Sequence, residues 1–213
     1  MMVRVDLLMS VDGFASTTDQ TAENPFGRDR SRLVETYVAT RTFREHVFSD
    51  SSGTGTTGVD DRYARHYFDG IGAEIMGAGK FGFHAFPEDP DWRGWWGGEP
   101  PFRCPVFVLT HRSRPPLAMK GGTNFNFVSA NPTDALAQAK KAANGKDVRI
   151  GGGPTVVREY LKAGRVDHLH VAIAPILLGR GVRLWNDLRG LDAGYTVDSE
   201  TAESGTIHLT FRR

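Results

Sequence analysis

The segment from residue 148 to 161, VRIGGGPTVVREYL, limits this chain to a fold that contains a strand–turn–helix unit. A β-favouring run leads into three glycines, and Pro154 then opens a stretch with helical spacing. Proline suits the first helical position because its missing N–H would have no partner there. Glycines let backbone N–H groups approach a ligand, and the helix N-terminus adds partial positive charge. We therefore expect the glycine segment, Gly151 to Val156, to cradle a phosphate group of a nucleotide.

The Rossmann dinucleotide fingerprint is only partly present in this segment. The pattern G-x-G-x-x-G needs a glycine where Val156 stands, and the acidic residue expected about 20 positions later is missing. A second interpretation of the glycines is a turn that only connects the strand to the helix. Three glycines in a row exceed what such a turn needs, so the sequence favours phosphate binding in a fold other than the standard Rossmann domain.

The composition is that of an ordinary globular protein. Its 213 residues are 39% hydrophobic and 24% charged, which suits one sizeable core, so we expect a single domain over residues 1–213. A formal net charge of +1, with scattered Lys and Arg, argues against a nucleic-acid partner. No apolar run has the length of a membrane span, and the single cysteine, Cys104, leaves no disulfide framework. These features predict a cytoplasmic protein without a membrane partner.

Strand and helix patterns alternate along the chain. Asp12 and Gly13 end a first strand with turn chemistry, and Asn131 followed by Pro132 marks the start of an alanine-rich helix. The order favours an α/β fold with a mostly parallel central sheet flanked by helices, and with the last strand antiparallel at an edge. The expected strands are 3–9, 73–76, 106–110, 148–150, 168–176 and 206–212, and helical spacing covers 31–48, 60–69 and the segments that begin at 132 and 154.

Four motifs in this order resemble the dihydrofolate reductase-like superfamily. They are SVDG at residues 10–13, IMG at 75–77, GGGPT at 151–155 and DHLHVAIAPILLGRG at 167–181. Within the superfamily, the chain is most similar to the reductase domain of bifunctional riboflavin-biosynthesis deaminase-reductases. The resemblance covers nearly the whole chain, and it implies a dihydrofolate reductase-type α/β fold, NADPH as the cofactor and a homodimer.

The resemblance also implies a set of cofactor-binding residues. The glycine segment would hold the pyrophosphate, and Leu8 and Ser10 would lie beside the nicotinamide. A hydroxyl and a cation in Thr110, His111 and Arg112 would suit the adenosine 2′-phosphate, although without the resemblance these residues indicate a solvated loop. The full set is Leu8, Ser10, Gly77, Ala78, Gly79, Lys80, Thr110, His111, Arg112, Gly151, Gly152, Gly153, Pro154, Thr155 and Val156.

The chain departs from the family pattern at two places. Relatives carry an arginine after the methionine–glycine pair that ends the middle strand, whereas this chain has Ala78, Gly79 and Lys80. Lysine supplies a charge but not the planar fork with which arginine binds phosphate. Relatives also place an acidic, substrate-contacting residue where Gly151 stands. The first departure bears on cofactor affinity and on the choice between NADPH and NADH, and the second bears on the identity of the substrate.

No single residue is indicated as the proton donor. Asp12 and Glu35 are the candidate acids, because Glu35 lies on the first expected helix, which carries the substrate-binding acid in dihydrofolate reductases. Asp12 precedes a glycine, so a turn-forming role is the better interpretation for it. The catalytic residues therefore stay unassigned.

Aromatic and histidine clusters leave further alternatives open. The side chains of Trp92, Trp95 and Trp96 could stack on a flat heterocycle, buttress a loop or form a dimer contact. His168 and His170 alternate with apolar residues, so both imidazoles face one side of a strand. Two histidines without a third ligand favour a polar sheet face or an interface, and no metal site is predicted.

These observations together predict an enzyme in which the cofactor carries the chemistry and the protein positions it. The expected activity is NADPH-dependent hydride transfer to a small heterocyclic or carbonyl substrate. The alternative is a non-catalytic nucleotide-binding protein derived from such a reductase.

Overall fold

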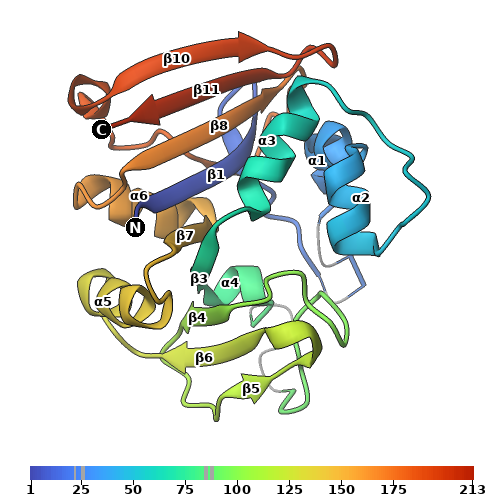
Figure 1. The fold of residues 1–213 in the computed structure, drawn as a ribbon. Coiled ribbons are helices and arrows are strands. Elements are labelled where there is room, and N and C mark those ends of the chain that lie inside the picture. The colour runs from blue at the N-terminus through green and yellow to red at the C-terminus, as the bar shows by residue number, and fades with distance from the viewer. Residues whose placement is uncertain (22, 25–26, 84–85, 87–88) are drawn as a thin grey trace.

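A nine-stranded sheet runs through the molecule in the order β10-β11-β8-β1-β7-β3-β4-β6-β5 (Figure 1). This computed structural model describes residues 1–21, 23–24, 27–83, 86 and 89–213. The six central strands are parallel: β8 (His168–Ala174), β1 (Val3–Ser10), β7 (Asp147–Gly152), β3 (Ile71–Gly77), β4 (Pro105–Leu109) and β6 (Asn124–Val128). Antiparallel strands continue the sheet on both sides: β11 (Ile207–Arg212) and β10 (Thr196–Thr201) beyond β8, and β5 (Leu117–Ala118) beyond β6. The mostly parallel central sheet predicted from the sequence is thereby confirmed.

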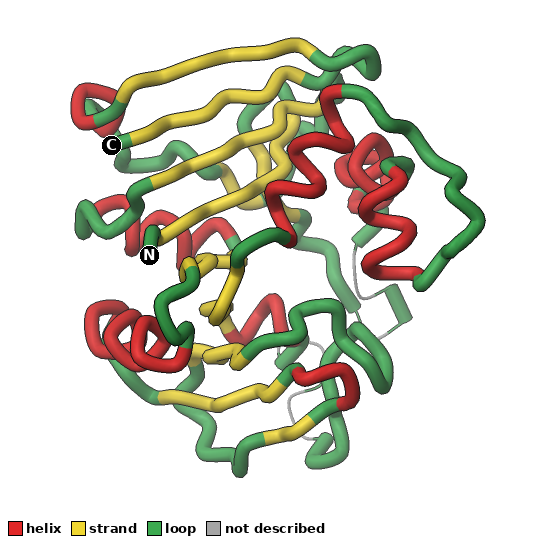
Figure 2. Tube along the Cα trace, viewed as in Figure 1, coloured by secondary structure: helices red, strands yellow, loops and turns green. Residues whose placement is uncertain are grey.

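Helices cover both faces of this sheet. On one side lie α5 (Pro132–Ala142) and α6 (Pro154–Lys162), and on the other lie α1 (Arg30–Val38), α2 (Arg41–Phe48) and α3 (Val59–Phe68). Figure 2 shows α1, α2 and α3 grouped together, apart from α5 and α6. The remaining elements are short: α4 (Ala78–Phe81), the 3-10 helices η1 (Lys120–Gly122) and η2 (Leu191–Gly194), and the small sheet of β2 (Phe14–Ser16) and β9 (Val182–Arg183). No helix in the described ranges is long and apolar enough to cross a membrane.

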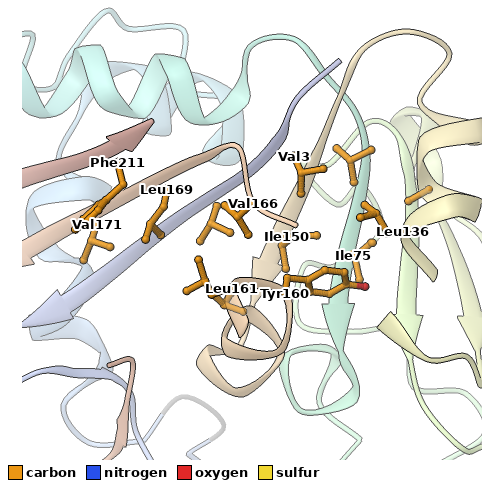
Figure 3. Packing of buried hydrophobic residues seen from close by; sticks show 14 of the residues in the cluster. Val3, Ile75, Leu136, Ile150, Tyr160, Leu161, Val166, Leu169, Val171 and Phe211 are labelled. Atoms are coloured by element: carbon orange, nitrogen blue, oxygen red, sulfur yellow. The ribbon is translucent and has the colours of Figure 1, made fainter. Parts of the chain in front are cut away.

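The main core lies between the sheet and helices α5 and α6. Alternate residues of the central strands point to this side, because successive side chains of a strand face opposite ways. Figure 3 shows their close packing against the apolar side chains of the two helices. The buried members that it labels are Val3, Ile75, Leu136, Ile150, Tyr160, Leu161, Val166, Leu169, Val171 and Phe211.

Local signals in the sequence correctly mark several boundaries. The side-chain oxygen of Asn131 caps α5 by accepting a hydrogen bond from the backbone N–H of Asp134 at 2.9 Å. Pro154 occupies the first turn of α6, with Gly153 as its N-cap. Gly13 has a φ of 88° in the turn after β1, a left-handed conformation that favours glycine.

Three expectations about the elements are wrong. The helical spacing at 31–48 belongs to two helices, because Thr40 takes an extended conformation and its hydroxyl accepts from the N–H of Phe43 to cap α2. The strand predicted to reach Ile176 ends at Ala174, before Pro175. The final strand is antiparallel, as predicted, but β10 lies outside it at the edge. The mostly exposed, largely polar residues of β10 carry no apolar alternation that would reveal a strand.

Candidate functional site

A cavity of about 1130 Å³ opens where the parallel strands β1, β3 and β7 end. Leu8, Gly77 and Gly151 line it from these strand ends, and helices α1, α2 and α3 supply another part of the wall. In α/β sheets, the crevice beyond the carboxyl ends of parallel strands is the usual place for a ligand. This cavity is therefore the candidate functional site.

The predicted phosphate cradle forms one end of the cavity. Gly151, Gly153, Pro154, Thr155 and Val156 line it. A Cβ atom added at Gly153 would meet no protein atom within 4 Å, so the backbone there faces open space. The N–H groups of the first helical turn have no partners inside the helix and carry partial positive charge. This geometry fits a phosphate group at the start of α6.

The other glycines of this region are explained by packing within the protein. A Cβ atom at Gly151 would lie 2.1 Å from Oε1 of Glu74, and one at Gly77 would lie 2.8 Å from Cγ2 of Val156. Gly152 is absent from the cavity lining and has a φ of 108°. Of the three consecutive glycines, Gly153 is the one at which the space beside the backbone is left for a ligand.

Lys80 does not extend freely into the cavity. Its ammonium group donates to Oε1 of Glu74 at 3.1 Å and to the carbonyl oxygen of Gly151 at 2.6 Å. Gly79 and Lys80 both line the cavity, whereas Ala78 packs into a second apolar cluster with Met76 and Phe81. The charge of Lys80 is thus matched by a buried carboxylate of the protein itself.

The remaining predicted cofactor residues lie at different depths. Leu8 lines the cavity, but Ser10 is fully buried, and its hydroxyl donates to Oδ1 of Asp12 at 2.6 Å. Thr110, His111 and Arg112 follow the carboxyl end of β4 and are not part of the cavity wall. They occupy the sheet edge on which the cavity opens, at a neighbouring strand.

A buried ion pair crosses the face of the sheet opposite the main core. Nε of Arg149 donates to Oε2 of Glu74 at 2.9 Å, and its NH1 group donates to the carbonyl oxygen of Tyr67 at 2.5 Å. The guanidinium carbon lies 3.7 Å from the centre of the Tyr67 ring. Burial raises the pKa of Glu74, but Arg149 and Lys80 outweigh it and hold that pKa below its usual value. Glu74 is therefore an ionised group that anchors both cations.

A chain of hydrogen bonds joins four further side chains on this face. His208 Nε2 lies 2.9 Å from Oδ1 of Asp60, and His208 Nδ1 lies 2.9 Å from His170 Nε2. His170 Nδ1 then lies 3.2 Å from Oδ1 of Asp6. The ring of Tyr63 stacks on both imidazoles, with centroid distances of 4.3 and 4.1 Å. All five residues line the cavity.

Aromatic side chains and one arginine complete the wall. Arg30 on α1 lines the cavity, and burial lowers the pKa of its guanidinium. The described residues place no carboxylate within ion-pair distance of Arg30, so an anionic group of a ligand can pair with it. The aromatic members of the wall are Tyr37, Phe43, Phe48, Tyr63, Tyr67, Phe68, Trp95, Trp96 and Phe102.

The candidate acids from the sequence do not face this cavity. Asp12 forms a turn, accepting from the N–H groups of Leu178 at 3.1 Å and Gly179 at 2.7 Å. Glu35 lies on the exposed side of α1. Glu74, Arg149 and the histidine chain were not predicted as a site, although charged residues inside otherwise apolar strands are the signal that reveals them.

The other candidate clusters are now placed. Trp95 and Trp96 line the cavity, whereas Nε1 of Trp92 donates to the carbonyl oxygen of Phe81 at 2.8 Å, a packing role. His168 and His170 share one face of β8, as predicted, and His168 packs against His66 of α3. In the described ranges, no group of three or more His, Cys, Asp or Glu side chains is arranged to hold a metal ion.

Comparisons with known proteins agree with this arrangement. The model of the RibD C-terminal domain family matches residues 1–207. A crystal structure of a putative riboflavin biosynthesis protein from Shewanella sp. PV-4 aligns over 100% of this chain and 99% of its own, at 17% identity and a TM-score of 0.60. RibD from Acinetobacter baumannii aligns over 99% of this chain and 57% of its own, at 18% identity and a TM-score of 0.51.

One curated protein shares detectable sequence similarity over part of its length. The uncharacterized protein YyaP of Bacillus subtilis is 27% identical over 85 residues, which are 40% of this chain and 45% of that protein. The match therefore spans less than half of either chain. Because the family model extends from the first strand to the last, the resemblance seen in the motifs is confirmed: the chain belongs to the RibD C-terminal domain family.

Proposed function

We propose that this protein is a reductase that transfers a hydride from NADPH to a small heterocyclic or carbonyl substrate. The observation that carries the proposal is one cavity that joins an open helix N-terminus at Gly153 to a wall of aromatic and ionisable side chains. The first part suits a dinucleotide phosphate, and the second suits a flat polar substrate. Membership in a family of riboflavin-biosynthesis reductase domains supports the same class of reaction.

Each part of the cavity would have a separate role. The backbone N–H groups of Thr155 and Val156 would hold the cofactor pyrophosphate, and Leu8 would border the nicotinamide. The bound cofactor supplies the hydride. Arg149, which is held by Glu74, would border the substrate space together with Tyr63 and the histidine chain.

The first experiment measures NADPH binding by isothermal titration calorimetry. We expect Gly153→Val to weaken binding at least tenfold, because its side chain would enter the space beside the phosphates. Gly98→Val is the matched control, since a Cβ atom there also meets open space and Gly98 does not line the cavity. No heat with NADPH or NADH at millimolar concentration, or equal weakening in both variants, would falsify the cofactor proposal.

Turnover separates the proposal from its alternative. NADPH oxidation is followed by fluorescence with 7,8-dihydrofolate as a C=N heterocycle and with benzaldehyde as a carbonyl acceptor. Consumption of NADPH with either acceptor supports a reductase. Tight binding of NADPH without consumption by any acceptor of these two classes would instead identify a non-catalytic nucleotide-binding protein.

The preference for NADPH over NADH rests on Thr110, His111 and Arg112, which lie at the same sheet edge as the cavity. Charge-assisted hydrogen bonds are worth roughly 1.5–3 kcal/mol, so Arg112→Ala should weaken NADPH about tenfold to a hundredfold and NADH little. Equal losses of affinity for NADPH and NADH would mean that this segment does not bind the 2′-phosphate.

Assembly as a homodimer is part of the same proposal. A dimer would give twice the chain mass of 23.4 kDa in light scattering at micromolar concentration. A mass that stays at the single-chain value across that range would contradict it.

A further inference from the structure

Arg30 differs from the other half-buried and buried arginines in that the protein does not match its charge. Within the described ranges, those others each donate a hydrogen bond to a carboxylate or a carbonyl oxygen, and they are Arg4, Arg44, Arg114, Arg149 and Arg158. The side chain of Arg30 has no such acceptor among the described residues. Taking a charge out of water without a partner costs free energy. An unmatched guanidinium in a cavity wall therefore points to an anion that a ligand brings.

The guanidinium belongs to the wall that α1, α2 and α3 give to the cavity. Arg30 is the first residue of α1 and lines the cavity. Burial lowers the pKa of its guanidinium, and the phenol of Tyr67 on α3 is the ionisable neighbour that opposes this lowering. Tyr67 lines the cavity as well, and its ring centre lies 3.7 Å from the guanidinium carbon of Arg149. Arg30 thus lies near the aromatic part of the wall, where an ion pair is stronger than in bulk water.

The charged groups around the cavity leave positive charge in excess. Lys80 and Arg149 share a single carboxylate, that of Glu74. Two carboxylates stand in the described part of the cavity wall, and both are bonded within the histidine chain rather than to Arg30. The charge of Arg30 adds to this excess. The cavity therefore attracts an anion.

The position of Arg30 assigns this anion to the substrate rather than to the cofactor. The phosphate cradle is at the start of α6, whereas Figure 2 shows α1 grouped with α2 and α3, apart from α6. A cofactor phosphate beside Gly153 would leave Arg30 available to a second anionic group. Arg30 shares its wall with Tyr63 and Tyr67, on the side of the cavity where the proposed substrate would lie.

We propose that Arg30 binds an oxyanion of the substrate, so that the substrates of this protein are heterocyclic or carbonyl compounds that carry a carboxylate or a phosphate group. The inference rests on the proposed reductase function. Both groups can offer two oxygens to the planar fork of an arginine. Arg30 would hold the substrate by this group and not at the reacting carbon, so it is a specificity-determining residue and not a catalytic one.

Binding is tested without turnover, by isothermal titration calorimetry with and without NADPH. The probes are benzoate, phenyl phosphate and uncharged benzamide. We expect at least one of the two anions to bind about tenfold to a hundredfold more tightly than benzamide, because charge-assisted hydrogen bonds are strong. Arg30→Gln should remove this difference, and Arg30→Lys should retain part of it. The anion that loses more affinity in Arg30→Gln identifies the group that the site prefers.

Arg41→Gln is the matched control for these titrations. Arg41 is the first residue of α2, as Arg30 is of α1, but it is exposed and does not line the cavity. Its replacement should leave the affinity for every probe unchanged. No binding of either anion at millimolar concentration, or equal affinity for the anions and benzamide, overturns the proposal. So does an Arg30→Gln variant that weakens NADPH but neither anion, because Arg30 would then bind the cofactor.

Urea denaturation separates ligand binding from a structural role. Arg30 has no partner to lose, so Arg30→Gln should leave the midpoint of denaturation unchanged or raise it. A clearly lower midpoint would give Arg30 a structural role and overturn the proposal.

Turnover distinguishes a failure of this inference from a failure of the reductase. NADPH oxidation is compared for 4-carboxybenzaldehyde, 4-formylphenyl phosphate and benzaldehyde. We expect kcat/KM to be at least tenfold higher for one of the charged acceptors, and Arg30→Gln to lose that preference while keeping its kcat/KM for benzaldehyde. Equal kcat/KM for all three acceptors refutes the anion site and leaves the reductase standing. Selective binding of the anionic probes without turnover of any acceptor refutes the reductase and the role of Arg30 in substrate choice together.

Discussion

The two faces of the central sheet are built by the same strands but differ in chemistry. Toward α5 and α6, the strands present apolar side chains such as Val3 and Ile150, which are fully buried. Toward α3, the same strands present Arg4, Asp6 and Arg149, which are also buried. Asp6 and Arg149 of the second face line the cavity, whereas Val3 and Ile150 do not.

This difference separates stability from function. Burial of apolar surface contributes roughly 25 cal/mol per Å², so the face toward α5 and α6 stabilises the fold directly. A buried ion pair contributes little net stability, because desolvation of its charges offsets their attraction. The charged face with Glu74 and Arg149 therefore adds little net stability, although the loss of one partner of the pair is costly.

The largest expected effect is the loss of one member of the buried ion pair. Arg149→Met leaves Glu74 ionised and buried with only Lys80 beside it, and should lower the free energy of unfolding by about 3–5 kcal/mol. Urea denaturation measures this change. In the double variant Glu74→Leu/Arg149→Met, most of the stability should return, since no fully buried charge is left unmatched and the Lys80 side chain, 24% exposed, can reach solvent. A single variant that loses less than about 1 kcal/mol would mean that the two faces do not differ as described.

An intermediate effect is expected in acid. Asp6 has a folded-state pKa of about 2 against an ordinary value of 3.8, so its ionised form stabilises the folded state. This contribution, about 2 kcal/mol, is present above pH 4 and is lost as the pH falls toward 2. Urea denaturation of the unmodified protein and of Asp6→Asn across this range should reveal a steeper loss in the former. Parallel curves would contradict the strong coupling of Asp6 to its cationic neighbours.

The smallest effect is expected on the apolar face. Ile150→Val removes one methylene group from the residue next to Arg149 in β7 and should cost about 0.5–1.5 kcal/mol. The dissociation constant of NADPH should stay unchanged, because Ile150 points away from the cavity. A weaker affinity for NADPH in Ile150→Val would contradict this, because it would show that packing on the apolar face affects cofactor binding.

Features that depend on residues close together along the chain were predictable from the sequence. Alternation in β8 correctly put His168 and His170 on one face, and the glycines and Pro154 correctly marked the junction between β7 and α6. The same local reasoning failed for β10, whose polar and exposed residues form a strand only because β11 offers a partner. It also left Glu35 as a candidate acid, since the exposed side of α1 is not evident without the surrounding structure.

The sequence by itself therefore determined the family, the alternation of strands and helices, and the glycine turn, because these depend on periodicity and on residue types close along the chain. The tertiary structure alone decided that Lys80 binds Glu74 and that Asp60, His208, His170 and Asp6 form one chain beside the cavity. Asp6 and His170 are 164 positions apart, and the parallel pairing of β1 with β8 places them opposite each other. Contacts of this kind follow from strand order, which no local pattern in the sequence encodes.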